Sequence, residues 1–189
     1  MYTNLDNLKD TAKHYGVQDI ASYVLDNPQF AISIAGLTHH KYEGGLVDHT
    51  FEVVELAKKN AEQYFAYTGY PNDNRSQQLF LAALFHDFGK IWDHEFVHNL
   101  DGPGSWQYSN HQSKIHHIQR SAIEWTKACI KFNYVDENDE VLHAILAHHS
   151  KERGSAVDPQ TPLAFILYVS DMTSAMMGKM QVKYIGIQE

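Results

Sequence analysis

The chain has 189 residues, enough for one domain with a substantial core, and its 43% hydrophobic and 20% charged residues are ordinary for a soluble protein. A net charge of −8 argues against a protein that grips long duplex nucleic acid over its whole surface. Cys129 is the single cysteine, which excludes an internal disulfide. Without a signal peptide or a bilayer-length apolar run, we expect a cytoplasmic protein that does not enter membranes.

Turn signals divide the chain into segments whose apolar residues are mostly spaced three and four apart, as in amphipathic helices. The first long helix is predicted over 46–67. Its buried side is expected to carry Leu46, Thr50, Val53, Val54, Ala57 and Ala61. The segment 74–87 predicts a second helix, opened by Asn74 or Ser76 and apolar enough to be buried.

Three more helices are predicted over 111–130, 137–150 and 161–177. Thr161 is placed to cap the last of them, with Pro162 at its first position. Residues 99–110 are predicted to be a flexible loop, and the one notable strand signal is in the tail 181–187. With no repeat and no low-complexity tract, the sequence predicts a compact all-α, multi-helix domain.

Histidine is unusually frequent, with 13 residues in an acidic chain. Five predicted helices carry a histidine or aspartate near an apolar face: His49, His86 with Asp87, His116 with His117, His148 with His149, and Asp171. A single buried histidine is more often a core residue with its hydrogen bonds satisfied than a metal ligand. Five helices that each place a histidine or aspartate near an apolar face favour a shared cation. Imidazole and carboxylate ligands suit manganese, iron, zinc or nickel.

The pair His86–Asp87 falls where its helix is predicted to end. A loosened last turn would let both neighbours face one centre, with Asp87 bridging two ions. Gly89 would then allow an unusual backbone angle, and Lys90 would offer a positive charge to a phosphate oxygen. The alternative is an ordinary helix end, with a glycine stop and a lysine that complements the helix dipole.

The order of these residues, H…HD…H…HH…D, resembles that of the HD-domain metal-dependent phosphohydrolase superfamily. The stretches "HHKYEGGLVDHTFEVVELA", "AALFHDFGKI", "HHIQRS" and "ILAHHSKERGSAVDPQTPLAFILYVSDMTSAMM" resemble in particular the catalytic domain of the HD-type 3′-5′ exoribonucleases of Gram-positive bacteria. The resemblance implies a single HD domain over 1–189, with a helical leader (1–38), an HD core (39–177) and a C-terminal tail (178–189). Those enzymes carry an OB domain before the HD domain, and at this place we expect the helical leader in this chain.

The resemblance also implies a ligand set for one or two divalent cations. The ligands of the first would be His49, His86, Asp87 and Asp171, and those of the second would be His117, His148 and His149, with Asp87 shared. His116 is the fallback for His117. Asp87 and Lys90 would be the catalytic residues.

Substrate binding is predicted for Lys90, Trp106, Lys151 and Arg153, through base stacking by the tryptophan and phosphate contacts by the cations. An ordinary surface loop around Trp106 and a solvated turn around Lys151 are the plain alternatives. His39 and His40 either line the pocket entrance or cap a turn.

The sequence therefore predicts a divalent-metal-dependent phosphohydrolase that cleaves phosphoester bonds of nucleotides or of short or 3′-terminal nucleic acid. Nucleotidase or dNTP triphosphohydrolase activity is the nearest alternative. From other classes, we consider a mixed-valence di-iron oxygenase and a metal-binding regulatory module without turnover.

Overall fold

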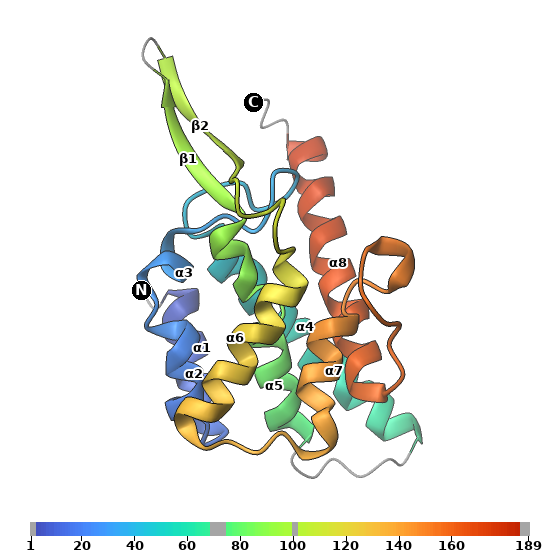
Figure 1. The fold of residues 1–189 in the computed structure, drawn as a ribbon. Helices are drawn as coiled ribbons and strands as arrows, with labels where there is room; N and C mark the ends of the chain where they lie inside the picture. The colour runs from blue at the N-terminus through green and yellow to red at the C-terminus, as the bar shows by residue number, and fades with distance from the viewer. Residues whose placement is uncertain (1–2, 69–74, 100–101, 186–189) are drawn as a thin grey trace.

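The computed structural model of the protein describes residues 3–68, 75–99 and 102–185, and the fold is all-α, as the sequence predicts (Figure 1). The α-helices of these ranges are α1 (Asn4–His14), α2 (Gln18–Leu25), α3 (Pro28–Ile32), α4 (Gly45–Thr68), α5 (Arg75–Phe85), α6 (His117–Phe132), α7 (Glu140–Ala147) and α8 (Pro162–Ile185). Short 3-10 helices are η1 (Phe88–Trp92), η2 (Glu137–Asp139) and η3 (Lys151–Arg153), and the strands are β1 (His94–Asn99) and β2 (Gly102–Tyr108).

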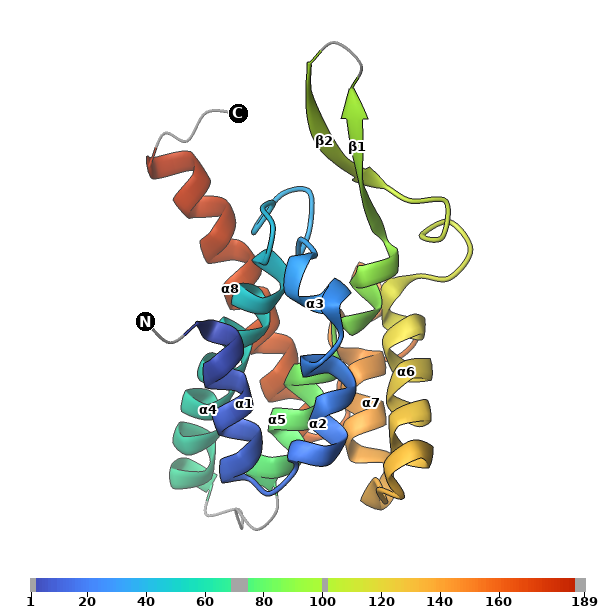
Figure 2. The ribbon, with the colours of Figure 1, turned by 90° about the vertical axis from the view of Figure 1, so that its left-hand side faces the viewer.

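Helix α5 lies at the centre of the bundle, packed against α2, α4, α6, α7 and α8 (Figures 1 and 2). Every residue from Leu79 to Phe85 is buried, which confirms the predicted buried helix. Asn74, one of its two predicted openings, lies outside the described residues. Because α5 is enclosed by other helices, the residues that follow its last turn are delivered into the interior of the protein.

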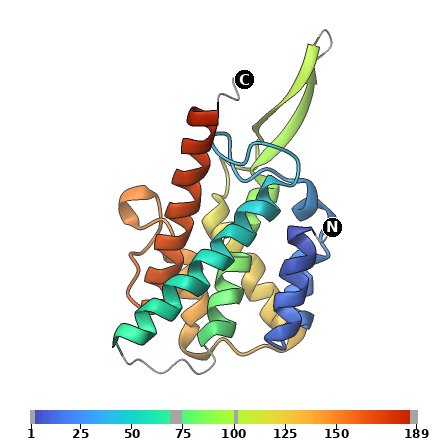
Figure 3. The same ribbon diagram turned by 180° about the vertical axis from the view of Figure 1, so that it is seen from behind.

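Helices α4 and α8 pack against each other on the side of α5 that faces the viewer in Figure 3. The predicted inner side of α4 is confirmed, since all six of its residues are at most 5% exposed. Helix α8 begins as predicted: the Thr161 hydroxyl accepts a hydrogen bond from the backbone N–H of Ala164 at 3.3 Å, and Pro162 is the first helical residue. These two helices carry His49 and Asp171 to the same depth of the bundle.

Two predicted helices begin later than their apolar pattern indicates. Helix α6 starts at His117 instead of residue 111, because 111–115 form a turn and His116 has an extended backbone (φ −64°, ψ 147°). Helix α7 starts at Glu140 because Asn138 and Asp139 have left-handed φ values of 58° and 55°, which an α-helix does not accommodate. Both late starts lie at polar turn residues that the hydrophobic pattern does not register.

Two predictions were wrong, that of a strand in the tail and that of a loop at 99–110. The tail 181–187 was expected to favour a strand, but α8 continues through Ile185, and residues 186–187 lie outside the described ranges. The segment 99–110 was expected to be a flexible loop, but Gly102–Tyr108 pairs with His94–Asn99 as an antiparallel hairpin that projects from one end of the bundle (Figure 2). Cross-strand aromatic pairs stabilise this hairpin, and one segment read alone does not show its pairing partner.

Among the described residues, no helix combines the length and the apolar character needed to cross a bilayer.

Candidate metal centre

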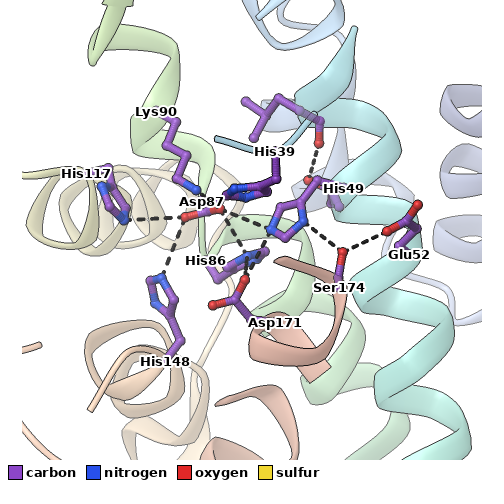
Figure 4. A network of polar contacts seen from close by, with 12 residues as sticks. His39, His49, Glu52, His86, Asp87, Lys90, His117, His148, Asp171 and Ser174 are labelled. Atoms are coloured by element: carbon purple, nitrogen blue, oxygen red, sulfur yellow. Dashed lines mark hydrogen bonds and ion pairs between the residues drawn. The ribbon is translucent and has the colours of Figure 1, made fainter. Parts of the chain in front are cut away.

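All seven residues predicted as metal ligands converge at the upper end of the bundle core (Figure 4). They come from α4 and α8, from the turns that follow α5 and α7, and from the start of α6: His49, His86, Asp87, His117, His148, His149 and Asp171. The donor atoms of His49, His86, Asp87 and Asp171 lie within 4.8 Å of one another, as do those of His117, His148 and His149. The structure therefore forms two neighbouring donor sets, which we call the first and second ligand sets.

Asp87 lies between the two ligand sets. Its Oδ2 atom is 3.3 Å from His49 Nε2 and 3.4 Å from His86 Nε2. Its Oδ1 atom is 3.5 Å from His117 Nε2 and 3.6 Å from His148 Nε2. One carboxylate thus presents a separate oxygen to each set, which is the arrangement a bridging ligand needs.

The inward-facing atoms of this cluster are buried without hydrogen-bond partners. They are His49 Nε2, His86 Nε2, His117 Nε2, His148 Nε2 and Asp87 Oδ1, while Asp87 Oδ2 contacts Lys90 Nζ. Leaving one such polar group unsatisfied costs about 1–3 kcal/mol, so five together demand a partner. Ligands about 2.1 Å from a shared ion and at right angles to one another would be about 3 Å apart, close to the spacing found here. The donor set therefore fits a divalent cation in each half of the cluster.

Backbone carbonyls orient two of the histidines. His86 Nδ1 donates a hydrogen bond to the carbonyl of Ala83 at 2.7 Å, and His148 Nδ1 donates to the carbonyl of Ile145 at 2.7 Å. Each histidine is the first residue after its helix, and each carbonyl is one that the end of the helix leaves without a helical partner. A proton held on Nδ1 leaves the Nε2 lone pair free to bind a metal.

Side chains orient the rings of His117 and His49. His117 Nδ1 lies 3.2 Å from Asp93 Oδ2, and a carboxylate can only accept, so the ring nitrogen donates. His49 Nδ1 lies 3.0 Å from Ser174 Oγ, and that hydroxyl donates to Glu52 Oε2 at 2.8 Å. Carboxylate support of this kind is typical of metal-binding histidines. The sequence analysis missed Asp93, Glu52 and Ser174, since the partners behind a ligand carry no spacing motif.

Burial and charge set the protonation of the cluster. Burial lowers the pKa of His148 to about 4 and holds that of His117 well below its usual value, so both rings are neutral. Burial would also lower the pKa of His86, but the carboxylates of Asp87 and Asp171 raise it to about 10. Burial opposes ionisation of Asp87, yet Lys90 and His86 hold its pKa well below the usual range. A cation would displace the proton on His86 and take over its role.

The neighbours His86 and Asp87 face one centre because α5 ends at Phe85. The next backbone hydrogen bond joins Lys90 N–H to the Asp87 carbonyl at 2.9 Å, and the chain changes from α-helix to the tighter η1. This confirms the predicted helix end at the pair.

Gly89 is needed for a different reason from the one predicted. Its φ is not among the positive values found for Gly16, Gly44 and Gly154, so it serves no unusual backbone angle. Instead, a Cβ at this position would lie 2.2 Å from the carbonyl oxygen of His117, and the Gly89 N–H donates to Ser121 Oγ at 2.8 Å. The missing side chain lets η1 pack directly on the start of α6, which places His117 beside Asp87.

The residues predicted to bind substrate are dispersed. Lys90 is buried, with Nζ 2.5 Å from Asp87 Oδ2, whereas Trp106 lies on β2 of the projecting hairpin. Lys151 is exposed, and its ammonium faces Asp158 at 3.9 Å instead of the cluster. Arg153 belongs to η3, and its side chain lies outside the described part of the structure. Of Lys90, Trp106 and Lys151, whose side chains the structure describes, Lys90 alone lies at the ligand sets.

A cavity opens beside the cluster where Lys90 and His117 face outward. Its other walls come from the loop before α4, the base of the hairpin and the turn before α6, and they include Thr38, His39, His94, Tyr108, Gln112 and His116. His39 and His40 also form a donor group with His49, their donor atoms lying within 4.8 Å of one another. The histidine doublet at 39–40 was the sequence signal for this wall.

The HD domain family model matches residues 46–176 of the chain. The chain belongs to the HD domain family. All seven residues of the two ligand sets fall within the matched region, and the predicted membership is confirmed.

Curated relatives of this HD domain include two exoribonucleases and one phosphodiesterase. The 3′-5′ exoribonuclease YhaM of Bacillus velezensis is 31% identical over 90% of this chain and 49% of its own length. YhaM of Bacillus subtilis is 33% identical over 75% of this chain and 42% of its own. The dihydroneopterin 2′,3′-cyclic phosphate phosphodiesterase of Methanocaldococcus jannaschii is 24% identical over 91% of this chain and 61% of its own. The chain spans about half the length of the YhaM proteins, and no solved structure matches it significantly.

Proposed function

We propose that this HD domain is a divalent-metal-dependent phosphodiesterase that cleaves phosphodiester bonds of short or 3′-terminal single-stranded nucleic acid. The observation that carries the proposal is Asp87, whose two buried oxygens face the first and second ligand sets separately. Such a carboxylate suits a pair of ions, and two-metal sites are widely used for in-line displacement at phosphorus. Both kinds of curated relative are named for the cleavage of phosphodiesters.

Divalent ions at this site would lower the pKa of a coordinated water to about 7 and offset the negative charge of the phosphate. The chain's own residues supply the rest. Asp87 connects the two sets, while His117 and His148, kept neutral by burial, stay available as ligands at neutral pH. Lys90 reaches both Asp87 and the adjoining cavity, where its ammonium would contact a non-bridging phosphate oxygen.

Reloading the metal-free protein with single ions tests the proposal. Protein stripped by a chelator would be reloaded with manganese, iron, nickel or zinc and assayed on the p-nitrophenyl ester of thymidine 5′-monophosphate, on p-nitrophenyl phosphate, on dATP and on single-stranded oligonucleotides. We expect the diesters to be hydrolysed, the monoester and dATP to react more slowly, and elemental analysis to find two ions per chain.

Other outcomes of this screen would contradict the proposal. Preferred cleavage of dATP or of the monoester would instead favour a triphosphohydrolase or nucleotidase. Oxygen consumption by the iron form, without hydrolysis, would favour an oxygenase. Metal binding without turnover on any substrate would favour a regulatory module.

Asp93 offers a test of the second ligand set alone. Replacing Asp93 with alanine should weaken binding of the ion at His117 by about 10- to 100-fold, because the ring loses the partner that fixes its orientation. Asp93→Asn is the matched control, since its amide oxygen still accepts from Nδ1. Burial and the Asp87 carboxylate raise the pKa of Asp93 to about 7, so the metal titration should be done well above that pH. Equal losses at both ions in the alanine variant would contradict the assignment.

A further inference from the structure

The hairpin carries aromatic and imidazole rings on one of its faces. Along a strand, alternate residues share a face, and the register of β1 and β2 brings the rings into cross-strand pairs. The residues of this face are His94, Phe96 and His98 in β1 and Gly104, Trp106 and Tyr108 in β2, and we call it the ring face. The ring centroids of His94 and Tyr108 are 5.3 Å apart and nearly stacked, and those of Phe96 and Trp106 are 5.5 Å apart and edge-to-face.

These rings are not buried in a core. Phe96 is 44% exposed and Tyr108 is 58% exposed, on a hairpin that stands clear of the helices (Figures 1 and 2). Phe96 lies over Gly104, where a Cβ would be 2.4 Å from its ring, so the strand leaves out a side chain to seat this aromatic group. The ring face has no aliphatic side chain, which distinguishes it from an ordinary apolar patch on the protein surface.

The ring face is continuous with the cavity at the metal centre. His94 and Tyr108, the pair at the base of the hairpin, line the same cavity as Lys90 and His117. Phe96 and Trp106 follow two residues farther out on each strand, about 7 Å away. A chain with one end at Asp87 would therefore pass the His94–Tyr108 pair first and the Phe96–Trp106 pair next.

We propose that the ring face holds the single strand that leads to the metal centre, with successive bases on Tyr108 and on the Phe96–Trp106 pair. The inference rests on the proposed phosphodiesterase function and adds to it that the preferred substrate is a strand of several nucleotides instead of a mononucleotide. Stacking on aromatic rings suits every base, because each has a π face. It also suits a protein with a net charge of −8, which cannot depend on a broad basic groove.

Binding to the metal-free protein tests the ring face separately from catalysis. The probe is a single strand of about ten nucleotides, labelled with fluorescein at its 5′ end and followed by fluorescence anisotropy. We expect the double variant Phe96→Ala/Trp106→Ala to bind it at least about tenfold more weakly than the wild type. The control is Glu95→Ala/Gln107→Ala, a cross-strand pair on the opposite face of the same hairpin, which should bind as the wild type does.

Catalysis by the metal-loaded proteins gives the second readout. The KM for the oligonucleotide should rise in the Phe96/Trp106 variant, while kcat and KM for the p-nitrophenyl ester of thymidine 5′-monophosphate stay unchanged. Wild-type affinity for the oligonucleotide in this variant, or equal losses in both double variants, would overturn the ring-face proposal. The proposal would also be overturned if the Phe96/Trp106 variant differed from the wild type in sedimenting mass but bound the oligonucleotide equally well. That result would mean that the ring face contacts a second copy of the protein. If the wild type fails to hydrolyse even the small ester, the proposed function itself is wrong, and the anisotropy result still decides the ring face.

Discussion

Replacing Asp87 with alanine is expected to abolish both metal binding and hydrolysis. Both ligand sets lose their shared carboxylate, and four histidine Nε2 atoms lose the negative charge they face at 3.3–3.6 Å. Elemental analysis should find no stoichiometric metal in the purified variant, and activity on the thymidine ester should fall below detection. Asp171 also faces both sets, with Oδ1 3.1 Å from His49 Nε2 and Oδ2 3.5 Å from His149 Nε2, but it reaches only this one histidine of the second set.

Folding must be controlled in this experiment, because the change also removes the carboxylate that faces the buried Lys90 ammonium and leaves His86 with Asp171 alone. Breaking a buried pair in this manner costs about 3–5 kcal/mol, so the alanine variant should melt at a lower temperature. Asp87→Asn keeps the volume and removes only the charge, and it should fold and still lack metal. Asp10→Ala, an exposed aspartate on α1, is the matched surface control. A folded Asp87 variant with wild-type hydrolysis would refute the bridging role.

Replacing Lys90 with methionine should leave the ions in place and reduce kcat by about 100- to 1,000-fold, the usual effect of removing one charge-stabilising donor. Lys90 Nζ contacts Asp87 Oδ2 at 2.5 Å. An ammonium there competes with a cation for the carboxylate, so its removal should strengthen metal binding. The paired measurements are a metal titration and the kcat for the thymidine ester.

Loss of the metal ions from the Lys90 variant would assign a different role to Lys90. Loss of the ions together with the rate would mean that Lys90 supports the ligand sets instead of contacting the phosphate. Lys58→Met, an exposed lysine on α4, controls for a general loss of positive charge. A KM increase without a change in kcat would indicate ground-state binding of the substrate only.

Much of the helical frame and all seven residues of the two ligand sets were predictable from the sequence. Helical spacing marked the inner side of α4 and the apolar α5, because a helix buried on one side has apolar residues three or four positions apart. The ligand residues stood out because ionisable groups next to apolar runs are costly unless something holds them. His49 and Asp171 are far apart in the chain, yet each could be recognised as a candidate ligand because it is an ionisable residue near the apolar face of its own helix.

Features that depend on a partner distant in the sequence were not predictable. The hairpin at 94–108 exists because Phe96 meets Trp106 and His94 meets Tyr108, and neither half has a strong strand pattern. The purpose of Gly89 was misjudged because the atom it avoids, the carbonyl oxygen of His117, is brought there by packing. Asp93 and Ser174 were missed for the same reason, since each is recognisable only from the ring behind which it lies.

The attachment of His86 and His148 to the main chain bears on how this centre tolerates change over evolution. Each imidazole is held by the carbonyl three residues before it, and that group is present whatever side chain the residue carries. Substitutions at Ala83 or Ile145 that preserve the helix would leave both rings aimed as they are. By contrast, His117 and His49 depend on Asp93 and Ser174, which a single base change in the gene can remove. Relatives with diverged sequences should therefore keep the orientation of the rings at positions 86 and 148 and vary mainly in the side chains that support those at 117 and 49.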